Sequence, residues 1–204
     1  PKNAGAFHNR GWTKSKLKDY AAAIKDYDEA IRCFQKALEH DRNCAMAYWG
    51  MARANVNNRG RAKGFAFCVS FGVPVAEVIE VEDTPSGLRM TGAWAAVDVG
   101  TALDPANIVA QVQGGMVYGL SAALRGEITF ADGRVEQQNF WDYEPLRLSQ
   151  VPDIQVRVLE SGGMIRGIGE PGTPPAAPAL ANALFKLTGK RVRSLPLSKA
   201  FSFA

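Results

Sequence analysis

Residues 104–126, DPANIVAQVQGGMVYGLSAALRG, carry the clearest helix signal in this sequence. Asp104 is suited to cap the first turn and Pro105 to occupy it, since an aspartate accepts a backbone N–H and a proline lacks one. Gly114 and Gly115 lie in the middle of this helix, where each costs about 1 kcal/mol relative to alanine. We therefore expect another group to approach the helix closely at these two glycines.

The segments on either side of this helix predict strands and a second helix. Before it, FAFCVSF, VAEVIEVED and LRMTGAWAAVDVG are β-branched, aromatic or alternating, and TPSG makes a hairpin turn. After it, EITFADGRVEQQNF predicts a hairpin around its Asp-Gly turn, and IQVRVLES predicts a strand. PALANALFKLTG predicts a helix ending at Gly189, and RVRSLPL a strand or extended tail. Hairpins mixed with helices predict an α+β domain over residues 61–204.

Residues 1–58 have a different, helical pattern. In DYAAAIKDYDEAIRCFQKALEH the apolar and small residues recur at spacings of three and four. Residues 4–56 resemble tetratricopeptide repeats, although the two repeat frames overlap at Ala30 and fewer than two full repeats are present. This resemblance implies either a helical hairpin that binds a peptide or protein ligand, or one that packs on the rest of the chain. NVNNRGRAKG reads as the linker to the second domain.

The distribution of charge argues against a nucleic-acid partner. The 204 residues carry a net charge of +4, of which residues 1–60 contribute +5, from 11 basic and 6 acidic residues. These charges alternate at helical spacing, which is typical of a solvated helix face. The sequence contains no apolar run long enough for a membrane span, so we expect a soluble chain of undetermined compartment. It starts at Pro1, and we expect a processed product or a fragment.

No metal-ligand pattern is present. The three cysteines include no C-x-x-C pair, so we expect free thiols and no disulfide framework, zinc site or iron–sulfur site. His8 and His40 have no second ligand nearby in the sequence. We predict surface or packing roles for both histidines and no metal site.

One acid, Glu170, stands among glycines and prolines in GIGEPGTPP, residues 167–175. Such a loop is either an ordinary surface turn or a rigid mount for a base beside a cofactor. Proline restricts the backbone and glycine lets other atoms approach closely, which suits the second interpretation. The local chemistry leaves both interpretations open.

From Gly64 to Leu197 the sequence resembles the C-terminal part of the molybdenum-binding large subunit of the xanthine dehydrogenase and aldehyde oxidase family. The similarity is greatest to the branch that contains isoquinoline 1-oxidoreductase. The matching stretches follow one another in the family's order: GFAFCVSFG, AVDVGTALDP, AQVQGGMVYGLSAALRGEIT, DGRVEQQNFWDYEPLRLSQVP and GIGEPGTPPAAPALANALFKLTGKRVRSLPL.

This resemblance implies a role for each residue of interest. Glu170 matches the general base that takes a proton from a hydroxide on molybdenum during hydroxylation of an aldehyde or N-heterocycle. Gln111 matches the glutamine that hydrogen-bonds the molybdopterin cofactor, and Gly114, Gly115 and Gly169 allow close approach to it. A structural polar position remains the alternative for Gln111. For Arg166 we favour a surface ion pair over a role in binding an anionic substrate.

The resemblance also shows what the sequence lacks. The family's glycine-rich strings GGGFG and GQG do not occur, nor does a cysteine cluster for electron transfer. We therefore expect the chain alone to be inactive and not to retain the cofactor. The remaining large-subunit portion and an iron–sulfur subunit are the implied partners. Two alternatives stay open: a non-catalytic interaction protein that uses the N-terminal helices, and a chimeric gene product without an established function.

Overall fold

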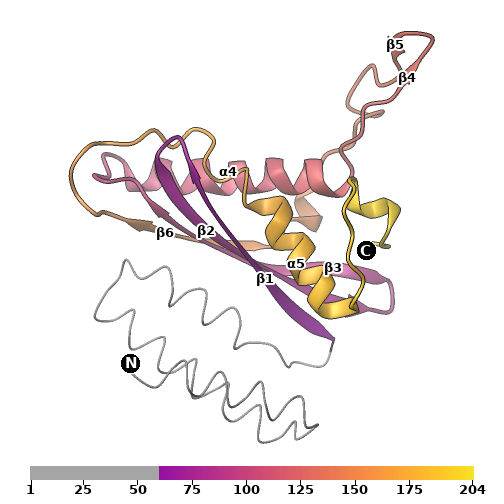
Figure 1. Ribbon diagram of the computed structural model, residues 1–204, viewed down its shortest axis with the longest axis horizontal. Coiled ribbons are helices and arrows are strands. Elements are labelled where there is room, and N and C mark those ends of the chain that lie inside the picture. The colour runs from indigo at the N-terminus through magenta and orange to yellow at the C-terminus, as the bar shows by residue number, and fades with distance from the viewer. Residues whose placement is uncertain (1–59) are drawn as a thin grey trace, which may run out of the picture.

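The computed structural model describes residues 60–204, which form a four-stranded sheet with both α-helices on one face, and a separate two-stranded pair (Figure 1). The helical hairpin predicted for residues 1–58 lies outside the described residues. The elements, in chain order, are β1 (Arg61–Ser70), β2 (Val73–Thr84), β3 (Gly87–Asp98), α4 (Pro105–Leu124), β4 (Phe130–Ala131), β5 (Arg134–Val135), the 3₁₀ helix η1 (Leu148–Gln150), β6 (Asp153–Leu159), α5 (Ala176–Thr188) and the 3₁₀ helix η2 (Leu197–Lys199).

The described residues confirm the α+β prediction. The main sheet has the order β1-β2-β3-β6, in which the first three strands are antiparallel neighbours and β6 runs parallel to β3. A parallel pair needs a crossover connection, and α4 lies within that connection. The second predicted hairpin is present as the short pair β4–β5, which turns through Asp132 and Gly133 at positive φ.

The predicted linker is wrong from Arg61 onward, because β1 already begins there. Arg61 is opposite Glu82 in the β1–β2 register, and its guanidinium contacts that carboxylate at 2.9 Å. A Cβ added at Gly64 would lie 2.1 Å from the Ala179 carbonyl oxygen. The glycine that resembled a linker residue is therefore the place where α5 crosses β1 in close contact. At the other end of the domain, residues 191–196 form an extended tail and no strand.

The core lies between the sheet and the two helices. Apart from Ala76, which is buried on the other face, the buried side chains of β2 alternate along the strand, as expected for a sheet with one face covered by helices. In α4 the buried positions recur at intervals of about four residues. The largest fully buried apolar side chains in this core are Ile79, Met116, Leu120, Leu180, Leu184 and Leu197.

Glu77 is an acid on this buried face. Its side chain is 0% exposed and neither carboxylate oxygen has a hydrogen-bond partner. Opposite it in the register stand Ala66 on β1 and Ala95 on β3, neither of which offers a polar side chain. Burial raises the pKa of Glu77 to about 9, so the carboxyl group is neutral at pH 7.

We expect Glu77→Gln to stabilise the domain at neutral pH and to flatten the dependence of its stability on pH. The pKa is raised in the folded state, so the free energy of unfolding falls as pH rises from about 4.5 towards about 9. At pH 7, keeping the buried Glu77 carboxyl group protonated lowers the free energy of unfolding by on the order of 3 kcal/mol. Each pH unit above the pKa of the unfolded state contributes about 1.4 kcal/mol.

Urea denaturation at several pH values measures this effect. The control is Asp83→Asn, which removes an exposed carboxylate from the same strand. If the free energy of unfolding of Glu77→Gln depends on pH between 5 and 9 as steeply as that of the wild type, the raised pKa of Glu77 is contradicted.

Candidate functional site

Helix α4 presents a polar and glycine-containing face to solvent. Asp104 caps the helix as predicted, because its carboxylate accepts the Asn107 N–H at 3.0 Å. Val112 and Met116 point into the core, which leaves Gln111 and Gly114 on the exposed side of the helix. Capping and burial together therefore set which residues of α4 reach solvent.

The glycine and proline loop before α5 lies directly against α4. A Cβ added at Gly119 would lie 2.6 Å from the Thr173 carbonyl oxygen, and one at Gly172 would lie 2.8 Å from the Val112 carbonyl oxygen. At Gly115 the added atom would meet the Gly172 backbone at 3.2 Å. Backbone therefore packs on backbone here, and side chains at Gly119 and Gly172 would force the two segments apart.

Between α4 and this loop lies a pocket of about 580 Å³. Residues from three segments line this pocket: the β1–β2 turn, the exposed face of α4 and the loop before α5. The lining residues are Ser70, Phe71, Gln111, Gly114, Gly115, Tyr118, Gly169, Glu170, Thr173 and Pro174.

All five residues predicted for the site line this pocket, although they come from segments about sixty residues apart in the sequence. The predicted close approach is present at Gly115, where the loop makes the contact. At Gly114 it is not, because nothing lies within 4 Å of the position of a Cβ. Gly169 is similarly open. These two glycines therefore leave space that no group in the described part of the chain fills.

Glu170 lies at the start of a tight turn, and its side chain is exposed. Its carbonyl oxygen accepts the Thr173 N–H at 2.8 Å, which closes a turn through the buried Pro171 and Gly172. The Glu170 side chain is exposed and makes no hydrogen bond or ion pair within residues 60–204. The partial burial that suits a catalytic base is therefore not supplied by these residues.

Arg166 pairs on the surface, as we favoured. Its guanidinium lies 3.4 Å from the Asp98 carboxylate, which also accepts the N–H groups of Gly100 and Ser161. This cluster ties the segment after β6 to the end of β3. Arg166 therefore helps to hold the loop that leads to Glu170 and does not line the pocket.

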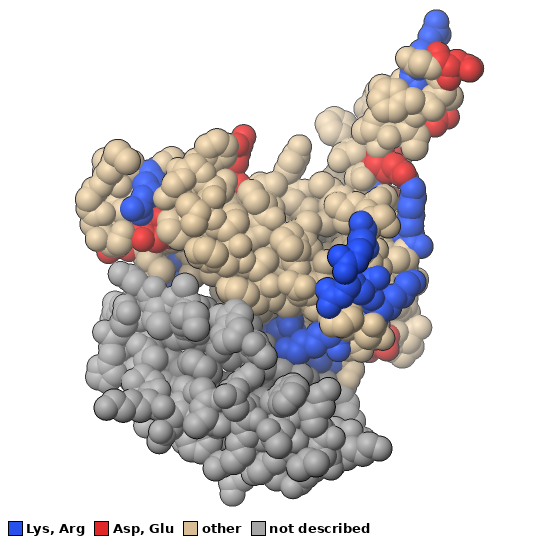
Figure 2. Space-filling model, in the orientation of Figure 1, with Lys and Arg blue, Asp and Glu red and all other residues tan. Residues whose placement is uncertain are grey.

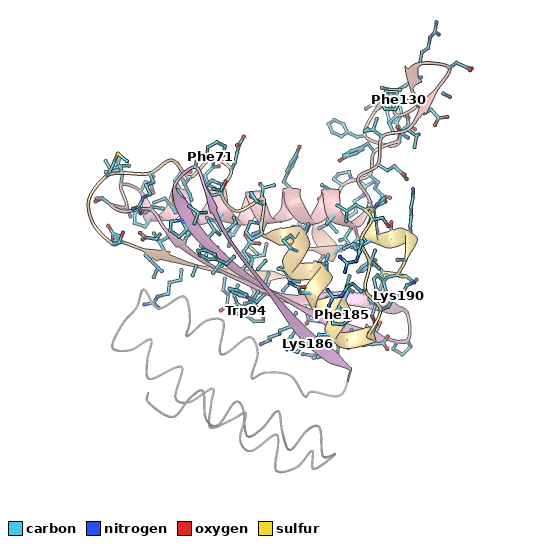
Figure 3. The ribbon with its side chains drawn as sticks, in the orientation of Figure 1. Phe71, Trp94, Phe130, Phe185, Lys186 and Lys190 are labelled. Carbon is cyan, nitrogen blue, oxygen red and sulfur yellow. The ribbon has the colours of Figure 1, made fainter. Side chains whose placement is uncertain are left out.

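Sequence reasoning missed five pocket residues: Ser70, Phe71, Tyr118, Thr173 and Pro174. Phe71 has φ of 52°, a left-handed conformation that costs a residue with a side chain about 1–2 kcal/mol. Its ring is 76% exposed and stands at the edge of the pocket (Figure 3). The string SFG between two strands signalled a turn, but only the tertiary structure brings that turn beside α4.

Among the described residues that line the pocket, Glu170 is the one charged side chain, and none is a lysine or arginine. Among residues 60–204, no group of three potential metal ligands is close enough to hold an ion. No helix in that range is long and apolar enough to span a bilayer. The described part of the lining therefore offers an amide, a carboxylate and open glycines, and no cation for a negatively charged ligand.

We expect Gly119→Ala to destabilise the domain by about 1–3 kcal/mol, because the new methyl group overlaps the Thr173 carbonyl. Gly114→Ala has free space and should stabilise the helix by up to about 1 kcal/mol. Equilibrium denaturation measures the free energy of unfolding of both variants. A Gly119→Ala variant that is as stable as Gly114→Ala would show that α4 and the loop are not in close contact.

Comparison with known proteins points to one family. The molybdopterin cofactor-binding domain family matches residues 4–152. Isoquinoline 1-oxidoreductase subunit beta of Brevundimonas diminuta is 38% identical over 159 residues, which cover 77% of this chain and 20% of that protein. The membrane-bound aldehyde dehydrogenase of Gluconacetobacter polyoxogenes is 36% identical over 104 residues, 51% of this chain and 14% of that protein.

Solved structures agree. The crystal structure of quinoline 2-oxidoreductase from Pseudomonas putida 86 superposes with a TM-score of 0.54 at 25% identity, over 61% of this chain and 17% of that one. The chain therefore spans about a fifth or less of the length of these relatives. The comparisons do not support the tetratricopeptide resemblance of the N-terminal segment.

Proposed function

The chain belongs to the molybdopterin cofactor-binding domain family, and from this premise we propose that it forms the base-bearing side of a molybdenum hydroxylase site. In this proposal Glu170 is the general base in the oxidation of an aldehyde or an N-heterocycle. The observation that carries the proposal is the pocket in which Glu170 and Gln111 meet beside two open glycines.

The residues of the pocket fit part of the cofactor. The Gln111 amide can both donate to and accept from a pterin edge, and it has no partner within the described residues. Gly114 and Gly169 leave room for a flat ring system beside the backbone. Among residues 60–204, the pocket lining includes no cationic partner for a phosphate. When bound, the molybdenum cofactor supplies the two-electron redox chemistry of the reaction.

Glu170 has the chemistry of a proton acceptor in this pocket. Its carboxylate makes no ion pair with the described residues, so both oxygens are available. The turn through Pro171 and Gly172 limits the movement of its backbone. A base in a set position within hydrogen-bond reach of the reacting group contributes about 10²–10⁴-fold to a rate.

The non-catalytic alternatives predict a different outcome. An interaction protein or a chimera has no need for an open glycine beside Gln111. The experiment below separates the two classes, because only the enzyme requires metal.

We expect Glu170→Gln to lower kcat by about 100-fold or more, with molybdenum content unchanged, because the amide cannot accept the proton. The chain is co-expressed with the part of the Brevundimonas diminuta subunit beta that lies outside the matched segment, and metal content and aldehyde oxidation are measured. Absence of molybdenum both with and without that partner would overturn the proposed function.

A second variant separates cofactor binding from stability. We expect Gly114→Ala to lower the molybdenum content of the same complex although it stabilises the chain, because the methyl group enters the open space beside Gln111. Ala122→Ser on the same helix, outside the pocket, is the control. Unchanged metal content in Gly114→Ala would place the cofactor elsewhere.

A further inference from the structure

Residues 176–204, which comprise α5 and the chain that follows it, carry five lysines and arginines and no acid. Figure 2 shows Lys and Arg side chains gathered over the end of α5. Lys190, Arg191 and Arg193 are exposed and form no ion pair with an acid in the described part of the chain. The end of α5 therefore carries positive charge that the described acids leave unneutralised.

Ordinary helix chemistry accounts for only part of this charge. Lys186 lies in the last turn of α5 and Lys190 just beyond it, where a cation stabilises the negative end of the helix dipole. Lys199 pairs with the Glu127 carboxylate. The dipole acts within the last turn, so it does not explain Arg193, which makes no hydrogen bond or ion pair with the described residues.

Two of the cations are held in position by uncharged groups. Lys190 donates its ammonium to the Ala200 carbonyl at 2.9 Å, and this ammonium lies 5.3 Å from the centroid of the Phe201 ring. The Arg191 guanidinium lies 3.8 Å from the centroid of the Phe185 ring. In Figure 3, Phe185 and Lys190 lie near the end of α5. A carbonyl and a ring carry no net charge, so both cations remain available to an external anion.

The segment after α5 adds an apolar side chain to this group. Val192 packs against the core, so its neighbours Arg191 and Arg193 extend outward. Leu195, two residues further on, is 55% exposed, although the following Pro196 is buried. Two arginines and a leucine therefore project from a short segment that the core holds in place.

We propose that Lys190, Arg191, Arg193 and Leu195 form a basic surface that docks on an anionic lipid bilayer. Cations are attracted to the phosphate groups of such a bilayer, and an exposed leucine can enter the apolar layer beneath them. A bilayer is broad and flat, so this partner requires no pocket. None of the four residues lines the pocket of Glu170, so the role of the basic surface does not depend on the function proposed above.

The surroundings favour lipid over nucleic acid as the anionic partner. Single-stranded nucleic acid binds by stacking its bases on aromatic rings beside the cations. Two rings at the basic surface, those of Phe185 and Phe201, already hold Arg191 and Lys190 over their faces. Leu195 adds nothing to a contact with a phosphate backbone, whereas it fits the apolar layer of a bilayer.

Co-sedimentation of the full chain with vesicles tests this proposal. Vesicles of phosphatidylcholine alone are compared with vesicles of an equimolar mixture of phosphatidylcholine and phosphatidylglycerol. Each Lys or Arg at an anionic surface strengthens binding about 5-fold, so three cations should favour the mixed vesicles by about 100-fold at low salt. The preference should fall steeply as the salt concentration rises, because the charges are exposed.

Single substitutions assign the binding to the basic surface. We expect Arg191→Gln and Arg193→Gln each to weaken binding to the mixed vesicles by about 5-fold. Leu195→Ser should weaken it by about 4-fold or more, the effect of one buried CH₂ group. The matched control is Arg134→Gln on β5, which removes the same charge from another exposed site and should leave binding unchanged. All variants keep residues 1–59, so any contribution of that segment is common to them.

The possible outcomes separate the partners. Equal binding to the two kinds of vesicle would overturn the proposal, as would arginine variants that bind like Arg134→Gln. Arg193→Gln keeps the test decisive if Arg191→Gln unfolds on losing its contact with Phe185. Binding of a single-stranded oligonucleotide or of polyglutamate, without binding to mixed vesicles, would assign the surface to nucleic acid or to an acidic polypeptide and overturn the lipid proposal. Displacement from vesicles by inorganic phosphate at low concentration would overturn it in favour of an isolated phosphate site.

Discussion

The contact between the backbone of α4 and the turn after Glu170 is the constraint on which the site depends. Gly119 and Gly172 have no side chains, so the helix and the turn approach to within van der Waals contact. The helix carries Gln111 and the turn carries Glu170, which means that this contact sets the distance between the amide and the carboxylate. Proline and glycine in the loop are therefore packing residues as much as turn residues.

Helices cover one face of the sheet, and the side chains on that face form the core of the domain. Within the core, Glu77 is retained although its carboxyl group has no hydrogen-bond partner, and folding must keep it neutral at a cost in stability. On the exposed side of α4 lies the pocket that Glu170 lines, and the segment 126–146 beyond the end of this helix exposes the rings of Phe130, Phe140 and Trp141.

These features show which chemical groups this member of the family places around the pocket. The chain supplies a positioned carboxylate, an amide and space beside two glycines, which are the parts of a cofactor site that local backbone geometry can provide. Among residues 60–204, the pocket lining includes no cationic group, and the Glu170 side chain is exposed. A partition of this kind is expected where a domain spans about a fifth of the proteins it resembles.

The sequence by itself determined the elements and the chemistry: the Asp104 cap, the end of α5 at Gly189, the alternation in β2 and the solitary acid in GIGEPGTPP all follow from local interactions. It also misassigned Gly64 to a linker, because a glycine required by a crossing helix reads like one required by a flexible chain. Only the tertiary structure decided that the turn at Phe71, the face of α4 and the loop at Glu170 share one pocket. The reason is that their proximity depends on contacts between segments distant in sequence, which leave no local pattern. For the same reason, only the tertiary structure shows that the Glu170 side chain and the aromatic rings of residues 126–146 are exposed.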